Sequence, residues 1–241
     1  MGLGSGTQLA LAVFTAIAEA HGQPAGVRDH APALGRGGRS GVGVATFEEG
    51  GLVVDAGHPT EQFTSDPPTP GSWQIPTVTT RVVLPDSWRI LLVIPAARRG
   101  RSGATEDASM RTVIETADAA IADEIDRLLT ADLLPAIDDA AIVKAGAAMT
   151  AIGRANGRWY RSVQGGQYRS PADGVIGALE SAEVIHGIGQ SSWGPAVYGL
   201  IRARDSETAK QLGQHALAKC GVDGSVRVVN PASTGAAIDH G

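Results

Sequence analysis

The amino-terminal stretch Gly2–Gln8 has the composition of a phosphate-binding loop. Three of its seven residues are glycines, and it leads directly into the apolar run Leu9–Ala18. Such a run favours a helix, whose first backbone N–H groups lack partners and carry partial positive charge. Glycines let this backbone approach an anion closely. An ordinary capped helix has the same composition, so the stretch alone leaves both interpretations open. The predicted phosphate ligands are Gly2, Gly4, Ser5, Gly6, Thr7 and Gln8.

A second candidate anion site is the loop at residues 35–41, where Arg36 and Arg39 stand between glycines. Flexible backbone there would allow both guanidinium groups to turn toward one phosphate, and arginine binds phosphate through two parallel hydrogen bonds. The alternative is a solvated loop with two surface arginines.

Residues 187–195 form another glycine-rich segment, with an unusual set of polar and aromatic side chains. The amide of Gln190 and the hydroxyls of Ser191 and Ser192 suit phosphate or sugar groups, and Trp193 could cover an aromatic ring. The alternative is a tight connection in which Trp193 fills the core.

Acid–base chemistry has few candidates in this chain. Asp55 and His58 follow a predicted strand, where functional side chains often project. His58 could transfer a proton, and Asp55 could bind Mg²⁺ or orient a base. The alternative for Asp55 is a turn-forming role. The histidines show no metal-ligand spacing, and no nucleophile elbow is present.

These residues need a mixed α and β framework to position them. The sequence predicts a helix from Leu9 to about His21, two or three helices between residues 106 and 156, and a final β-α-β unit. Val42–Phe47 and Leu52–Ala56 flank a glycine-bearing connection and predict a hairpin. The other predicted strands are 78–84, 88–94, 184–186, 196–202 and 225–230, and the other predicted helices are 171–180 and 206–219, the last capped by Ser206.

Composition narrows the class of protein. The chain has 241 residues, of which 43% are hydrophobic and 19% charged, as in ordinary globular proteins. A net charge of −5 argues against non-specific nucleic-acid binding. The single cysteine, Cys220, excludes an internal disulfide and fits a reducing cytoplasm. The run Leu9–Ala18 is about ten residues, too short to span a bilayer.

Taken in order, the motifs resemble those of the β-ribofuranosylaminobenzene 5′-phosphate synthases, which belong to the GHMP kinase superfamily. The resemblance rests on four stretches that together reach from one end of the chain to the other. They read GLGSGTQLALA, GRGGRSGVGVATFEEGGLVVDAGH, PDSWRILLVIP and GIGQSSWGPAVYG. Gln8 and Trp193 distinguish these motifs from the usual loops of the small-molecule kinases.

The resemblance implies an α+β, GHMP-kinase-like fold. It further implies an incomplete ribosomal-protein-S5-like domain over residues 1–86 and a ferredoxin-like α/β sandwich over residues 87–241. Relatives carry a segment before the first glycine loop, so we expect either a mis-assigned start or a shortened chain. An exposed sheet edge would then make a homodimer reasonable.

The implied reaction joins phosphoribosyl diphosphate to 4-aminobenzoate or 4-hydroxybenzoate, with release of CO₂ and diphosphate, in tetrahydromethanopterin biosynthesis. Mg²⁺ is expected with the diphosphate. Asp55 and Glu48 would stabilise positive charge on the ribose, Arg36, Arg39 and the first loop would bind diphosphate, and Trp193 would face the aromatic ring. The alternatives are an ATP-dependent GHMP-type kinase and a catalytically silent binding protein.

Overall fold

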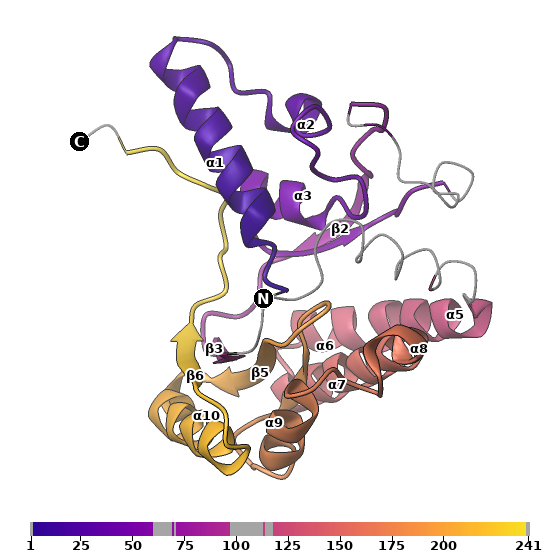
Figure 1. Cartoon of the computed structure of the whole chain (residues 1–241), viewed down its shortest axis with the longest axis vertical. Helices are drawn as coiled ribbons and strands as arrows, with labels where there is room; N and C mark the ends of the chain where they lie inside the picture. The colour runs from indigo at the N-terminus through magenta and orange to yellow at the C-terminus, as the bar shows by residue number, and fades with distance from the viewer. Residues whose placement is uncertain (1, 60–68, 70, 97–112, 114–117, 240–241) are drawn as a thin grey trace. The chain divides into compact units, whose positions relative to one another are not determined.

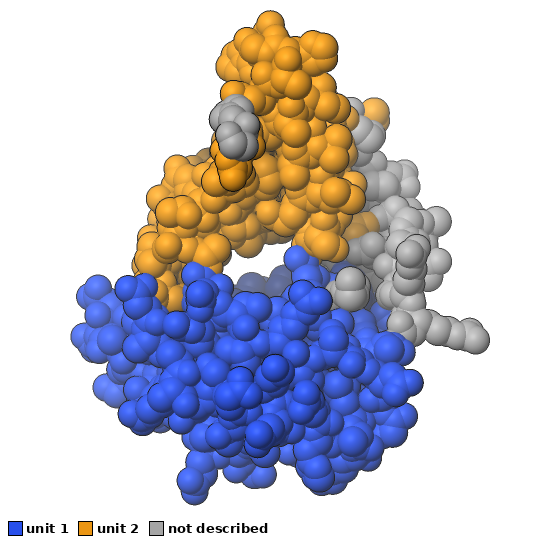
Figure 2. Space-filling view, turned by 90° about the vertical axis from the view of Figure 1, so that its left-hand side faces the viewer, with its two compact units in different colours: residues 1–3, 85–231 blue, residues 4–84, 232–241 orange. Residues whose placement is uncertain are grey.

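The computed structural model describes residues 2–59, 69, 71–96, 113 and 118–239. These residues belong to two compact units, coloured separately in Figure 2. Unit 1 comprises residues 1–3 and 85–231, and unit 2 comprises residues 4–84 and 232–241. The chain therefore enters unit 1 twice, and its carboxyl-terminal segment returns to unit 2.

Unit 1 is built on a four-stranded antiparallel sheet (Figure 1). Its strands are β3 (Trp88–Pro95), β4 (Gly187–Gln190), β5 (Val197–Arg202) and β6 (Gly224–Val229), in the order β4-β5-β3-β6. The apolar strand β3 is central, pairing with β5 on one side and with β6 on the other. With helices after β3 and after β5, this is the β-α-β-β-α-β order of a ferredoxin-like sandwich.

Helices pack against this sheet. The apolar faces of α9 (Ala172–Leu179) and α10 (Ser206–Lys219) bury residues such as Val175 and Leu217 against Leu91 and Ile201 of the strands. Strand β4 instead receives α7 (Ile142–Trp159), at Gly146 of the helix. The other described helical segments are α5 (Ala119–Arg127), the π-helical turn η2 (Leu128–Leu133), α6 (Leu134–Asp138), α8 (Arg161–Gln164) and the 3₁₀ turn η3 (Ala203–Asp205).

Unit 2 combines three helices with a two-stranded sheet. Its elements are α1 (Ser5–Ala20), α2 (Val27–His30), α3 (Val42–Glu49), β1 (Leu52–Asp55) and β2 (Val78–Val82). The core brings Leu11 of α1 onto Val44 and Phe47 of α3, with Ala31 beside them. The carboxyl-terminal segment completes the unit, because Gly51 N–H donates to the Ala232 carbonyl (2.7 Å) and Ala236 N–H donates to the Phe47 carbonyl (2.7 Å).

The predicted hairpin over residues 42–56 is wrong. Val42–Glu49 is helix α3, and Leu52–Asp55 pairs with Val78–Val82 instead. The β-branched residues that suggested a strand are overridden by tertiary packing, since the helical spacing of Val44 and Phe47 buries both side chains. The Asp55 carboxylate also holds the amino end of the helix, through a hydrogen bond from Gly41 N–H (2.7 Å).

Smaller differences concern unit 1. The strand predicted at 184–186 begins at Gly187 instead, where glycines allow α7 to approach closely. Ser206 does not cap α10, because its hydroxyl donates to the Ala203 carbonyl (2.6 Å). Helix α7 ends at Trp159 and the short helix α8 follows it, beyond the predicted helical region of residues 106–156. The part of that region before residue 118 lies outside the described residues, apart from Val113.

The class and the remaining elements agree with the prediction. The α+β fold is confirmed, and strands 78–82, 88–95, 197–202 and 224–229 and helices 5–20, 172–179 and 206–219 lie within a few residues of their predicted bounds. Within the described part of the chain, no helix has the length and apolar character required to cross a membrane.

Candidate functional site

The amino end of α1 offers backbone donors, as the first glycine motif predicts. Gly4 precedes the helix in a left-handed conformation (φ 64°, ψ 10°), and no side chain among the described residues caps it. Thr7 and Gln8 donate to the Gly4 carbonyl, which closes the first turn. The N–H groups of Ser5 and Gly6 precede the first of these bonds, so the end of α1 presents them together with the positive end of the helix dipole.

Arg36 lies beside this first turn. A Cβ atom at Gly6 would stand 3.6 Å from Arg36 Nη1, an ordinary van der Waals distance, so the guanidinium group lies against this turn. The backbone of Arg36 is fixed by two hydrogen bonds, its own N–H donating to Ala31 (2.8 Å) and Trp73 Nε1 donating to its carbonyl (3.0 Å).

The side chain of Arg36 is incompletely paired. Its Nε is buried and has no hydrogen-bond partner among the described residues. A buried donor without a partner costs about 1–3 kcal/mol. An anion at the α1 terminus would supply the missing acceptor.

Helix α3 joins α1 at the same end. Gln8 Nε2 donates to the Gly43 carbonyl (2.8 Å), and a Cβ at Gly43 would lie 3.2 Å from Thr7 Cγ2. The first turns of the two helices therefore pack against each other. Of the predicted phosphate ligands, Gln8 thus has a structural contact that holds the two helix ends together.

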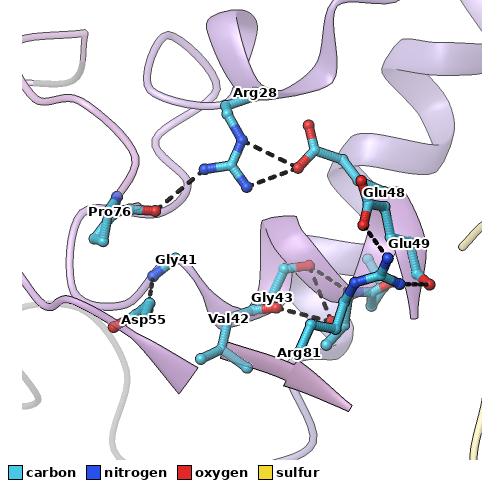
Figure 3. A network of polar contacts seen from close by, with 11 residues as sticks. Arg28, Gly41, Val42, Gly43, Glu48, Glu49, Asp55, Pro76 and Arg81 are labelled. Carbon is cyan, nitrogen blue, oxygen red and sulfur yellow. Dashed lines mark hydrogen bonds and ion pairs between the residues drawn. The ribbon is translucent and has the colours of Figure 1, made fainter. Parts of the chain in front are cut away.

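Asp55 organises the loop before α3 (Figure 3). Its Oδ2 accepts from Gly41 N–H (2.7 Å) and from the Ser40 hydroxyl (3.2 Å), and its Oδ1 accepts from Gly57 N–H (3.0 Å). Both carboxylate oxygens are engaged with the loop. The contacts of Asp55 are therefore those of a turn-forming residue, which was the alternative interpretation.

Glu48 lies at the other end of α3 and pairs with Arg28 (Figure 3). Arg28 Nη2 stands 2.8 Å from Glu48 Oε2, and Arg28 Nη1 donates to the Pro76 carbonyl (3.1 Å). From Gly41 to Glu48 the helix rises roughly 10 Å. The structure therefore does not bring Glu48 together with Asp55, which caps the opposite end.

Arg39 is part of the arginine-glycine loop at residues 35–41, and His58 contacts this loop. His58 Nε2 lies 2.8 Å from the Gly37 carbonyl, and because a carbonyl only accepts, Nε2 carries the proton. Arg39 lies in the exposed part of the loop. Arg36 lies beside the amino end of α1, and Asp55 lies at the amino end of α3. The arginine-glycine loop therefore lies close to the first turns of both helices.

The glycine-rich segment at residues 187–195 belongs to unit 1, and it contacts Gly2 at the start of the amino-terminal glycine motif. The Ser191 hydroxyl donates to the Gly2 carbonyl (2.7 Å) across 189 positions of sequence. A Cβ at Gly2, whose φ is 72°, would overlap the Ser191 carbonyl oxygen. Gly2 is thus required for a close backbone contact with the β4–β5 loop, rather than for direct phosphate contact alone.

The same loop borders a pocket of about 160 Å³ in unit 1. Trp193 meets Tyr160 edge to face, with ring centroids 4.9 Å apart. Gln190 accepts from Arg169 N–H (2.7 Å) and donates to the Ser192 carbonyl (2.8 Å). Trp193 is half-buried in this wall. The alternative interpretation, in which Trp193 fills the core, is therefore wrong.

Several residues of these sites were not predicted. Tyr160, Gln164 and Tyr168 line the pocket, and Arg28 neutralises Glu48. The aromatic residues and glutamines between positions 159 and 168 were the available signal, but their spacing matches no known motif. A metal centre built by the protein is not evident, since the described residues contain no group of three or more potential metal-ligating side chains.

Comparisons with known proteins give a consistent family of relatives. A synthase that makes β-ribofuranosylphenol 5′-phosphate in Methanothermobacter thermautotrophicus is 34% identical over 211 residues, covering 86% of this chain and 62% of that protein. Its counterpart in Archaeoglobus fulgidus is 34% identical over 203 residues, covering 83% and 60%. The chain thus spans less than two thirds of the length of these relatives. No family profile matches the chain.

Among solved structures, homoserine kinase from Cytophaga hutchinsonii is similar, with a TM-score of 0.61 and 15% identity. The alignment covers 97% of this chain and 66% of the kinase. At this identity the similarity concerns the fold alone, which is the fold of GHMP kinases.

Proposed function

Because the chain is homologous to the β-ribofuranosylphenol 5′-phosphate synthases and has the fold of GHMP kinases, we propose that it transfers a phosphoribosyl group to an aromatic acid. The observation that carries this proposal is the likeness to two archaeal synthases over more than four fifths of the chain. The donor is phosphoribosyl diphosphate, and the acceptor is 4-hydroxybenzoate or 4-aminobenzoate.

The amino end of α1 is suited to an anionic leaving group. Its uncapped first turn and the incompletely paired Arg36 concentrate positive potential where diphosphate charge would develop. Arg39, on the same loop, would add a second cation. Gly4, Ser5, Gly6 and Thr7 would contribute backbone and hydroxyl donors.

The bond changes balance without a further reactant. The anomeric C–O bond breaks and diphosphate leaves with the electron pair. The ring carbon bearing the carboxylate then bonds to the anomeric carbon, and the C–CO₂ bond returns its electrons to the ring as CO₂ leaves. The Asp55 carboxylate lies at the amino end of α3, so it is the proposed electrostatic stabiliser of the ribosyl cation. Glu48 is removed from this role by its pairing with Arg28.

The name of the relatives bears on the acceptor. A ribofuranosylphenol product retains a hydroxyl on the ring, which corresponds to 4-hydroxybenzoate as acceptor. We propose 4-hydroxybenzoate first and 4-aminobenzoate second.

Mg²⁺ fits this site only as a companion of the substrate. The described residues form no group of acidic or histidine ligands, and both oxygens of Asp55 already accept hydrogen bonds. Mg²⁺ typically binds substrate phosphates with one or two carboxylates and several waters, and we propose Asp55 as its protein ligand. Bound Mg²⁺ would neutralise diphosphate charge.

The test is to incubate the purified chain with phosphoribosyl diphosphate and each benzoate and to follow CO₂ release and the ribosylated product. Product formation with either benzoate supports the proposal. Phosphorylation of small alcohols by ATP, with no reaction of phosphoribosyl diphosphate, would instead indicate a kinase. Ligand binding without turnover would indicate a silent binding protein.

A further inference from the structure

The pocket in unit 1 has the size and lining of an aromatic-ring site. It lies among α7, α8 and the β4–β5 loop, with a volume of about 160 Å³. A protein cavity of roughly 150 Å³ holds one benzene molecule. Its lining residues are Gly153, Asn156, Gly157, Tyr160, Gln164, Gln167, Tyr168, Gln190, Ser192 and Trp193.

This lining contains no acidic or basic side chain. Arg154, on α7 beside it, pairs with Glu180. Burial raises the pKa of the Tyr168 hydroxyl, so this lining group stays neutral at physiological pH. An ionised carboxylate inside the pocket would therefore lose its hydration among uncharged side chains, and the guanidinium group beside Tyr168, that of Arg154, is already paired with Glu180.

Hydrogen bonds within the wall fix its shape. Gln190 Nε2 donates to Gln164 Oε1 (3.2 Å), and Gln164 Nε2 donates to the Gln167 carbonyl (2.8 Å). Asn156, Ser192 and Trp193 add an amide, a hydroxyl and an indole N–H to the lining. These neutral groups suit a neutral hydroxyl or amino substituent on a ring.

We propose that this pocket binds the ring of the 4-substituted benzoate, with the 4-substituent inward and the carboxylate at the mouth. The proposal rests on the synthase function above. The pocket accommodates the ring, and its uncharged lining decides which end of the benzoate stays outside. The ring carbon that bears the carboxylate, where the new C–C bond forms, then lies outside the pocket.

The pocket is also connected to the phosphate motif through the chain. Ser191, next to the lining residue Ser192, holds Gly2, and Gly2 precedes the first residue of α1 by three positions. The β4–β5 loop thus both borders the pocket and holds Gly2.

The experiment is calorimetric titration of benzoates into the full chain in the presence of inorganic diphosphate. We expect 4-hydroxybenzoate to bind, and terephthalate, which carries a second carboxylate at the 4-position, to bind at least about tenfold more weakly. Trp193→Leu should weaken 4-hydroxybenzoate binding by about tenfold or more, whereas Trp193→Phe should keep it within about threefold. Ser192→Ala should weaken 4-hydroxybenzoate binding, whereas Ser206→Ala, which removes a hydroxyl outside the pocket, is the matched control and should leave it unchanged.

The outcomes separate this inference from the proposed function. If Trp193→Leu keeps the wild-type KM for benzoate in an active enzyme, or if terephthalate binds as tightly as 4-hydroxybenzoate, the pocket assignment is overturned and the synthase stands. If 4-hydroxybenzoate does not bind, the assignment is likewise overturned. If binding follows the expected pattern but neither benzoate yields product, the synthase reaction is overturned and the pocket assignment stands.

Discussion

At the scale of single residues, the contacts of each charged side chain separate structural from chemical roles. Asp55 and Glu48 both have partners that hold the loop or the helix in place. Arg36 differs, because its fixed backbone carries a guanidinium group with a buried nitrogen that no described residue satisfies. Groups left unpaired in an otherwise well-packed unit are candidates for ligand contacts.

Replacing Arg36 with alanine should therefore weaken binding of phosphoribosyl diphosphate. A charged hydrogen bond contributes about 1.5–3 kcal/mol, so we expect the dissociation constant to rise about tenfold to a hundredfold. Arg81→Ala is the matched control, since Arg81 pairs with Glu49 at the far end of α3. Equal affinities in the two variants would remove Arg36 from the phosphate site. Unchanged affinity and turnover in Arg39→Ala would do the same for Arg39.

His186 predicts a pH dependence of stability in unit 1. Burial, followed by Arg202 and then Arg204, lowers the pKa of this imidazole, while Asp205 opposes the shift. The folded state therefore disfavours the protonated form. Above the unfolded pKa of about 6.5 neither state is charged, and stability is lost as the pH falls below that value, because the unfolded chain binds the proton more readily.

The measurement is the urea-unfolding free energy of unit 1 at pH 7.5 and at pH 5.5. Wild type should lose more stability between these values than His186→Gln. His21→Gln, at the exposed end of α1, is the control and should retain the wild-type slope. Identical slopes for wild type and His186→Gln would contradict the prediction.

At the scale of elements, glycines determine how closely α7 approaches the sheet. A Cβ at Gly146 would overlap the carbonyl carbon and oxygen of His186, just before β4. Both atoms belong to the backbone, so neither can move away as a side chain would. This contact also sets the position of α7, whose later residues line the pocket.

Gly146→Ala should thus destabilise unit 1, in spite of the better helix propensity of alanine. Overpacking against backbone costs about 1–3 kcal/mol and exceeds the propensity gain of about 1 kcal/mol. Gly177→Ala in α9 is the control, because a Cβ there meets no atom within 4 Å and only the propensity gain remains. Chemical unfolding followed by tryptophan fluorescence, to which the buried Trp88 of β3 contributes, would compare the two variants. A Gly146→Ala variant as stable as wild type would exclude the proposed close packing.

The same elements show what the sequence can and cannot predict. The apolar run of β3 and the helical periodicity of α10 are local signals, and both elements lie where expected. Helix α3 was missed because its β-branched residues favour a strand in isolation, and only its packing on Leu11 selects the helix. The pocket was missed for a different reason. Its wall combines α7, α8 and the β4–β5 loop, and no periodicity links Tyr160 to Trp193 before the fold brings them together.

At the scale of the molecule, the proposed chemistry is divided between the two units. The phosphate motif at α1 and α3 belongs to unit 2, and the aromatic pocket belongs to unit 1. The chain crosses between the units three times, after Leu3, after Leu84 and after Pro231. Perturbing one unit should then affect one ligand more than the other.

Removing residues 232–241 should selectively weaken unit 2. The deletion eliminates the hydrogen bonds from Gly51 to Ala232 and from Ala236 to Phe47, together with the close packing of Thr234 on Gly50. Two backbone hydrogen bonds contribute about 2 kcal/mol in all, before any packing loss.

Hydrogen exchange read by mass spectrometry should show faster exchange in the peptides of α3 and β1, with the β3 and β5 peptides unchanged. Affinity for phosphoribosyl diphosphate should fall while binding of 4-hydroxybenzoate is retained, and a loss of both in equal measure would contradict the division of the two sites between the units.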